Sequence, residues 1–156
     1  MLVIIPNFEY RYLVAKKSRK SGRPRYWTIN GQGLYNATLH YRLRAKITDY
    51  YHRYLSKYIK NQISKEDIQN INRKVYPGSS HKLSTALEIY DIKRGNMPDV
   101  GNLWLWIKWF EDSLQSSGVI PDDNMDYIRE SGRIKHHFVD DPDNRKLVFI
   151  IKIIES

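Results

Sequence analysis

The sequence contains no cysteine. Disulfide bridges, zinc sites with thiolate ligands and thiol catalysis are therefore excluded, and the absence fits a reducing, cytoplasmic compartment. Long hydrophobic runs are also missing, since the longest, residues 147–151, has only the length of a strand and a membrane span needs about 20 apolar residues. Residues 1–6 lack the positive region and the apolar stretch of a signal peptide. We therefore expect a soluble protein with no membrane contact.

Acidic residues are outnumbered by basic ones. The 156 residues include 17 Asp and Glu against 26 Lys and Arg, which gives a formal net charge of +9. Hydrophobic residues make up 41% of the chain, enough for a real core. The length predicts a single domain over residues 1–156. A charge of this sign indicates a polyanionic partner, most often nucleic acid, and the alternative is a basic protein with no such partner.

The positive charges gather in two places. Six of the ten residues in 16–25 are basic, with Ser, Gly and Pro between them, which predicts a loop. This loop is either an arm that contacts DNA or a solvated loop, and the basic stripe on a nearby helix favours the arm. The candidate DNA-contacting residues are Lys16, Lys17, Arg19, Lys20, Arg23 and Arg25 in the loop, Arg42, Lys46 and Arg53 on the helix, and Arg94 and Asn102 further along the chain.

Hydrophobic periodicity predicts three helices. The first is a long amphipathic helix over 34–59. Its apolar stripe consists of Leu39, Leu43, Ile47, Tyr50, Tyr54 and Tyr58. The segment 64–67 resembles a capping box and predicts a short second helix to about residue 74. Asn102 suits the N-cap of a third helix that ends near residue 115.

Strands are predicted on either side of these helices. They cover residues 2–5, 83–92, 133–139 and 146–154, and residues 10–14 extend or pair with the first strand. Residues 140–144 are expected to join the last two strands as a hairpin turn. The last strand is apolar on both faces, which predicts a central place in the sheet. The order β-α-(α)-β-α-β-β predicts an α/β fold, with a mixed sheet and helices on one side.

Carboxylates crowd both ends of the third predicted helix. Asp91 and Asp99 precede it, Asp122 and Asp123 follow it, and Asp112 lies on the helix itself. Like charges held close together repel, and a divalent cation relieves that repulsion. Carboxylate oxygens suit Mg²⁺, with Mn²⁺ as the alternative, and such ions activate water in phosphodiester hydrolysis. The other interpretation is that these residues only cap helices and form turns.

A motif register runs through the same region. It consists of Asp99-Val-Gly-Asn102, then Lys108, then Asp112-Ser-Leu114, then a Gly-Val-Ile-Pro step that ends at Asp122 and Asp123. This register resembles the RusA family of Holliday-junction resolvases, in the variant common in phages of Gram-positive bacteria. The close match covers residues 93–128. The order of elements extends the resemblance loosely over the whole chain.

The resemblance implies a homodimeric, Mg²⁺-dependent endonuclease that resolves four-way junctions and other branched DNA in recombination and repair. By position, Asp99, Asp122 and Asp123 would ligate the metal ion, and Asn102 matches the Asn of the motif. Lys108 would neutralise the scissile phosphate or the charge that develops on it. The catalytic set implied by the resemblance is Asp99, Lys108, Asp122 and Asp123.

One departure from the family pattern bears on catalysis. Gly101 stands where the motif has its second acid, so metal binding and rate would fall unless Asp91, Asp122 or a water replaces the lost ligand. The alternative function is a RusA-like DNA-binding protein with weak or no catalysis, and an unrelated RNA- or protein-binding domain is a third interpretation. Residues 141–144 also spell the motif, but a strand follows them instead of a helix with a lysine, and we interpret them as a turn.

The aromatic residues have several expected places. Trp104, Trp106 and Trp109 cannot all lie on one helical face, so some are expected in the core and others at a dimer surface. Most of the twelve tyrosines are expected in core positions, while one or two could stack on bases. His136 and His137 are adjacent on a predicted strand and point to opposite sides, which favours a structural role over joint metal binding.

Overall fold

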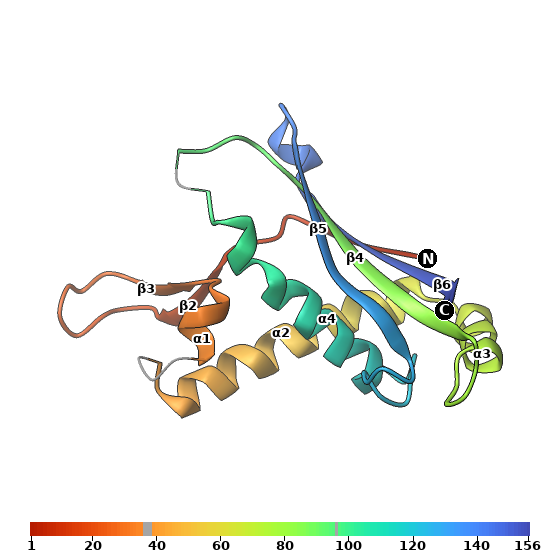
Figure 1. Ribbon diagram of the computed structural model, residues 1–156. Helices are drawn as coiled ribbons and strands as arrows, with labels where there is room; N and C mark the ends of the chain where they lie inside the picture. Colours follow the sequence, from red (N-terminus) through yellow and green to blue (C-terminus); the bar gives the residue numbers. More distant parts are fainter. Residues whose placement is uncertain (36–38, 96) are drawn as a thin grey trace.

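The computed structural model describes residues 1–35, 39–95 and 97–156 (Figure 1). It is a mixed α/β structure, as predicted, with a four-stranded sheet, a separate two-stranded sheet and helices packed on the larger sheet. The strands are β1 (Leu2–Pro6), β2 (Arg11–Ala15), β3 (Arg25–Thr28), β4 (His81–Asp91), β5 (Ile128–Phe138) and β6 (Lys146–Glu155). The helices are α1 (Gly31–Tyr35), α2 (Tyr41–Gln62), α3 (Lys65–Lys74) and α4 (Trp104–Ser116), with short 3-10 turns η1 (Val100–Asn102) and η2 (Pro142–Asn144).

The larger sheet has the strand order β1-β6-β4-β5. β4 runs parallel to β5 and antiparallel to β6, and β6 is antiparallel to β1. The predicted central place of the last strand is confirmed, and Leu147, Phe149 and Ile151 of β6 are buried. Parallel strands cannot be joined by a tight turn, so the chain crosses over between β4 and β5, and α4 lies in that connection.

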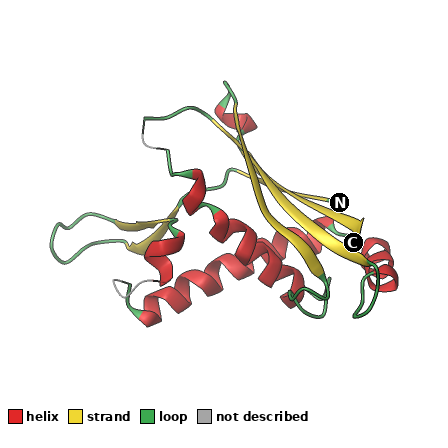
Figure 2. Ribbon diagram, in the orientation of Figure 1, coloured by secondary structure: helices red, strands yellow, loops and turns green. Residues whose placement is uncertain are grey.

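α2 and α4 pack against each other and against one face of the sheet (Figures 1 and 2). Phe110 of α4 stacks on Phe149 of β6, with ring centroids 4.1 Å apart. Tyr51 of α2 stacks on Trp109 of α4, with centroids 4.4 Å apart. These buried rings contribute large apolar areas and specific geometry, and they fix α4 in place between the sheet and α2. Among the residues that the structure describes, no helix is both long and apolar enough to span a membrane.

The long helix differs from its prediction in its start and in its buried stripe. α2 begins at Tyr41, α1 is a separate short helix, and residues 36–38 of the predicted helix lie outside the described residues. The buried residues of α2 are Ile47, Tyr51, Leu55 and Ile59. Tyr50, predicted in the stripe, is 47% exposed. Three of these four buried side chains are aliphatic and carry no hydroxyl that needs a partner when buried.

The start of α4 also lies beyond the predicted N-cap. Asn102 belongs to η1, where its N–H donates to the carbonyl oxygen of Asp99 at 2.9 Å. Leu103 occupies the N-cap position, and no side chain caps the helix. Because the 3-10 turn leads directly into α4, the first helical turn is displaced past Asn102.

Two predicted strand pairings are wrong. The last two strands do not form a hairpin, because β5 and β6 both pair with β4, which lies between them. Residues 10–14 do not join the first strand either, since β2 pairs with β3 in a hairpin of its own. The predicted turn at 140–144 is present and contains η2, where Asp141 accepts a hydrogen bond from the N–H of Asp143 at 2.9 Å.

Candidate active site

One ridge of α4 carries four chemically different side chains. Trp104, Lys108, Asp112 and Ser116 follow one another at four-residue spacing, and residues so spaced lie on the same face of a helix. The remaining faces of α4 are mostly buried against the sheet and α2. The apolar residues on the other faces of α4 therefore anchor the helix in the core, and this ridge remains at the surface.

Lys108 lies between two carboxylates. Its Nζ is 2.7 Å from Oδ1 of Asp112 and 3.6 Å from Oδ2 of Asp123. Asp112 is one helical turn further along α4, whereas Asp123 comes from the turn that follows the helix. The structure thus brings together Lys108 and Asp123, two of the predicted catalytic residues, and adds Asp112 to them.

The turn after α4 is built so that Asp123 faces Lys108. Gly118 has a φ of +75°, a left-handed conformation that ends the helix and that glycine adopts without strain. The Asp122 carboxylate then accepts hydrogen bonds from the N–H of Asp123 and from Nδ2 of Asn124, both at 2.8 Å. Asp122, predicted as a catalytic residue and metal ligand, therefore stabilises the turn, while its neighbour Asp123 contacts the lysine.

The two carboxylates beside Lys108 differ in pKa. Burial by itself raises the pKa of Asp112, but hydrogen bonds with His52, Lys108 and Asp123 outweigh burial and lower it to about 2. The pKa of Asp123 is raised, first by the hydrogen bond it shares with Asp112 and then by partial burial. Asp112 therefore keeps its negative charge while Asp123 takes up the first proton, as expected for two acids that share one site.

The charge of Lys108 is stabilised by the same groups. Partial burial lowers its pKa, but the hydrogen bond to Asp112 and the charges of Asp112 and Asp123 outweigh burial and raise it. The Lys108 side chain is 44% exposed. A positive charge that is held in a fixed place and remains accessible is suited to meeting an anionic group of a ligand.

Lys108, Asp112 and Asp123 form a cluster of charged side chains, and two further residues beside it were not predicted from the sequence. Nε2 of His52, on α2, lies 3.1 Å from Oδ2 of Asp112, although the two residues are 60 positions apart. Glu111 is buried and accepts a hydrogen bond from the hydroxyl of Thr85 on β4. Burial raises the pKa of Glu111. The four-residue step from Lys108 to Asp112 was a usable sequence signal, whereas nothing local in the sequence indicates the contact with His52.

The first motif acid, Asp99, has a different setting. It is exposed and precedes η1, and its backbone carbonyl accepts the N–H of Asn102. Within the described part of the chain, no hydrogen bond or ion pair joins the Asp99 side chain to Lys108 or Asp123. Gly101 is exposed, and a Cβ added there would meet no atom within 4 Å. The backbone thus leaves room for the acid that the family motif has at this position.

The donor atoms of the carboxylate pair suit a hard divalent cation. Asp112 and Asp123 offer carboxylate oxygens, and Mg²⁺ is usually held by one or two carboxylates together with substrate phosphates and waters. In residues 1–35, 39–95 and 97–156, no three or more His, Asp or Glu side chains are grouped closely enough to hold a metal ion. A cation at this pair would therefore take its remaining ligands from a substrate phosphate and from water.

Asp91 and Arg94 belong to a buried ion-pair network at the end of β4. Asp91 is fully buried, and its Oδ1 accepts hydrogen bonds from Nε of Arg145 and from Nη2 of Arg94, the latter at 3.2 Å. Arg145 also donates to the carbonyl oxygen of Phe8 at 3.2 Å. From the sequence, Asp91 is a predicted replacement for the missing motif acid and Arg94 a predicted DNA contact. Their observed contacts are those of a clamp that ties β4 to the start of β6.

The predicted basic arm is the loop of the β2–β3 hairpin. The hairpin extends away from the larger sheet, at the left of Figure 1. At its tip, the N–H of Gly22 donates to the carbonyl oxygen of Ser18 at 2.8 Å, and the N–H of Ser18 donates to that of Arg23 at 2.7 Å. The six basic residues of the arm are all exposed: Lys16, Lys17, Arg19, Lys20, Arg23 and Arg25.

The basic stripe of α2 leads to a groove next to the carboxylates. Its exposed residues are Arg42, Lys46, Arg53, Lys57 and Lys60. A groove of about 550 Å³ lies between α2 and the end of α4, and it is lined by Asp49, His52, Arg53, Ser56, Lys57, Lys60 and Ser116. The hydroxyls of Ser56 and Ser116 meet at 3.3 Å across the two helices. Because His52 lines this groove and also contacts Asp112, the cationic groove and the carboxylate pair adjoin each other.

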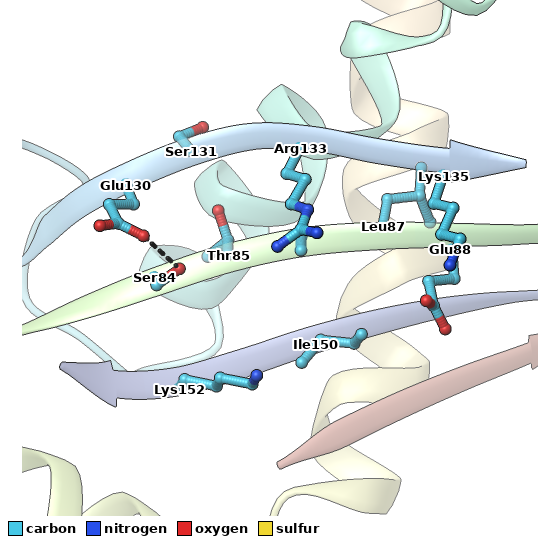
Figure 3. Close-up of a pocket in the computed structure, with 11 residues that line it drawn as sticks. Ser84, Thr85, Leu87, Glu88, Glu130, Ser131, Arg133, Lys135, Ile150 and Lys152 are labelled. Carbon is cyan, nitrogen blue, oxygen red and sulfur yellow. Dashed lines mark hydrogen bonds between the residues drawn. The ribbon is translucent and has the colours of Figure 1, made fainter.

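A separate groove of about 390 Å³ opens on the larger sheet (Figure 3). Ser84 of β4, Arg133 and Lys135 of β5, and Lys152 of β6 are among its lining residues. Ser84 donates a hydrogen bond to Glu130 at 3.3 Å. In Figure 3 the helices lie behind the strands. None of the candidate catalytic residues lines this groove, so it is not part of the candidate active site.

No protein-family model matches the chain, and a search of curated proteins finds no match.

Proposed function

We propose that the protein is a Mg²⁺-dependent endonuclease that cuts branched DNA, as the resemblance to the RusA family implies. The observation that carries this proposal is the position of Lys108 between Asp112 and Asp123, on a chain with a net charge of +9. An ammonium group can neutralise a phosphate, and a pair of carboxylates can hold a divalent cation. Hydrolysis of a phosphodiester bond uses both.

Lys108 is the residue that would meet the scissile phosphate. Its shorter contact, with Asp112, keeps the ammonium in place, while its longer contact with Asp123 can be exchanged for a phosphate oxygen. His52 holds Asp112 from the side of α2, so that this carboxylate keeps its orientation during the exchange. Asp112 and Asp123 would hold Mg²⁺, which supplies an activated water and stabilises the leaving oxygen when it is bound. Mn²⁺ is the alternative ion.

The basic surfaces support DNA as the substrate. The arm and the α2 stripe both carry exposed cations, and contacts of such cations with phosphates give affinity without sequence specificity. A two-fold homodimer would present two such sites to the opposed strands of a four-way junction. We place this activity in recombination and repair, in the cytoplasm of the cell.

The test is cleavage of a synthetic four-way junction with Mg²⁺, with Mn²⁺ and with neither ion. We expect metal-dependent, paired cuts by the wild type and loss of cutting in Asp123→Asn. The matched control is Asp126→Asn, because Asp126 is exposed in the same turn and its side chain contacts none of the cluster residues. A wild type that binds the junction but never cuts it with either metal would refute the enzymatic proposal.

A second candidate function is a DNA-binding protein of the same fold with little or no catalysis. The observation that favours it is Gly101, which removes a motif acid beside the exposed Asp99. Gly101→Asp separates the two candidates, because the open space around Gly101 allows the substitution without a clash. An inactive wild type that gains cleavage in Gly101→Asp would favour the binding function. Binding of RNA or of a protein, with no preference for DNA, would favour the third interpretation.

A further inference from the structure

An exposed aromatic pair stands at the head of the α4 ridge. Trp104 of α4 stacks on Tyr35 of α1, with ring centroids 5.9 Å apart and an interplanar angle of 11°. Trp104 is 38% exposed and Tyr35 is 53% exposed, whereas Trp106 and Trp109 of the same helix are fully buried. A ring pair that is stacked and still exposed offers a free aromatic face on which a further ring can stack.

The backbone of α1 is shaped around Trp104. Gly31 is buried, and a Cβ added to it would lie 2.2 to 2.5 Å from atoms of the indole ring. A contact that short is not tolerated, so only glycine allows the indole to lie in this place. Gly31 and Tyr35 are the first and last residues of α1. This short helix thus provides both the space for the indole and the ring that stacks on it.

The aromatic pair adjoins the candidate active site. Trp104 precedes Lys108 by one four-residue step on the same ridge, which is a rise of about 6 Å along the helix. A nucleotide whose phosphate meets Lys108 would therefore carry its base toward the ring pair.

We propose that Trp104 and Tyr35 form a stacking platform for an unpaired DNA base, on the nucleotide next to the phosphate that Lys108 binds. This inference rests on the proposed function and names the feature of branched DNA that the site recognises. Bases inside a duplex are covered by their neighbours, so only an unpaired or extruded base offers a free face to an aromatic ring. Stacking tolerates every base because each has a π face. The platform therefore selects for structure and not for sequence.

The test measures binding without cleavage, in EDTA, of three probes. They are a single strand of about 12 thymidines, a strand of the same length without bases, and a matched duplex. We expect Trp104→Leu to weaken binding of the thymidine strand about tenfold, in line with stacking on one base, and to leave the other two probes unchanged. Trp104→Phe should restore most of the loss. Tyr76→Leu is the matched control, because Tyr76 is 51% exposed and lies after α3.

A second variant covers the case in which loss of the indole disturbs the fold. Gly31→Ala keeps Trp104 but displaces its ring, and it should weaken binding of the thymidine strand alone. Equal losses for the baseless strand, or unchanged binding of the thymidine strand, would overturn the proposal. So would a dimer of this chain that dissociates in Trp104→Leu, because the rings would then be covered by a second copy. If no junction is ever cut while the base-dependent loss is observed, the enzymatic proposal fails and the platform stands.

Discussion

The ammonium group of Lys108 lies 3.6 Å from the carboxylate of Asp123, although the second half of α4 and a turn separate them in the chain. The contact requires that the chain reverse after Gly118 and run back beside the helix. The Asp122 carboxylate bonds within that turn hold Asp123 in position. Two of the four catalytic residues that the motif implies, Lys108 and Asp123, are thus brought together by local geometry, with no need for a ligand.

Removal of the lysine tests its role in catalysis. We expect Lys108→Ala to lower the single-turnover cleavage rate about 100-fold or more, because a positioned charge at the phosphate is lost. Lys108→Arg should retain part of the rate, since the charge remains. Lys135→Ala on β5 is the control, because Lys135 is exposed and lies outside the candidate active site. Cleavage by Lys108→Ala at the wild-type rate would contradict the assignment.

The contact between His52 and Asp112 predicts a smaller effect. In His52→Ala the Asp112 carboxylate loses its contact with α2, and we expect about a tenfold fall in cleavage rate. Ser56→Ala is the comparison, because Ser56 lies one turn further along α2 and contacts Ser116 instead of Asp112. Similar rates for the two variants would show that His52 does not support the carboxylate.

The buried ion pair of Asp91 predicts a pH-dependent stability. Burial alone raises the pKa of Asp91, but the hydrogen bonds from Arg145 and the N–H of Ile92 outweigh burial and lower it. An acid whose folded pKa lies below its unfolded value of about 3.9 stabilises the fold above that pH, and the contribution is lost as the pH falls through the folded pKa. Asp91→Asn leaves Arg145 without its counter-charge and should cost about 3 kcal/mol near neutral pH.

Urea unfolding from pH 7 down to about pH 2 measures this difference. The gap between wild type and Asp91→Asn should be largest above about pH 4 and should shrink in more acidic solution. Asp140→Asn is the control, because Asp140 is exposed near the same end of β4. A gap that stays constant over the whole range would show that the Asp91 charge is not what stabilises the clamp.

The basic arm predicts a change in the salt dependence of DNA binding. Replacing Lys16, Lys17 and Lys20 by Gln should lower the slope of log K against log salt by about 0.9 for each phosphate contact that is lost. The same number of charges can be removed from α3 as a control, at exposed Lys65, Arg73 and Lys74. Equal slopes for the two triple variants would show that net charge matters and that the arm makes no specific contacts.

The sequence predicted those elements whose signal is local. The last strand is central, as its apolar faces on both sides indicated, and the third helix ends where Gly118 allows. The pairing partners of the strands could not be predicted in the same way. β5 and β6 are joined by a single short turn, yet β4 lies between them in the sheet. Alternating burial gives the faces of a strand but not its neighbours.

In the candidate active site, too, some residues could be predicted from the sequence, and others are placed there only by the packing of distant segments. Lys108 and Asp123 follow from the motif register, and Asp112 follows from helical spacing. His52 contacts Asp112 only because α2 and α4 pack side by side, and no residue pattern within α2 indicates this contact. The stacked position of Trp104 likewise depends on Gly31, which lies in a different helix and has no side chain to signal its role.

The place of β6 has a consequence for the order in which the chain folds. β1 pairs with β6 in the larger sheet, and the N-terminal amine donates to the carbonyl oxygen of Ile151 at 2.8 Å. During synthesis, β1 therefore has no neighbouring strand to pair with until β6 leaves the ribosome. The β2–β3 hairpin can form earlier because its contacts are local in the sequence. The arm thus forms before the sheet that supports α4, so the proposed DNA-contacting arm is complete before the proposed active site.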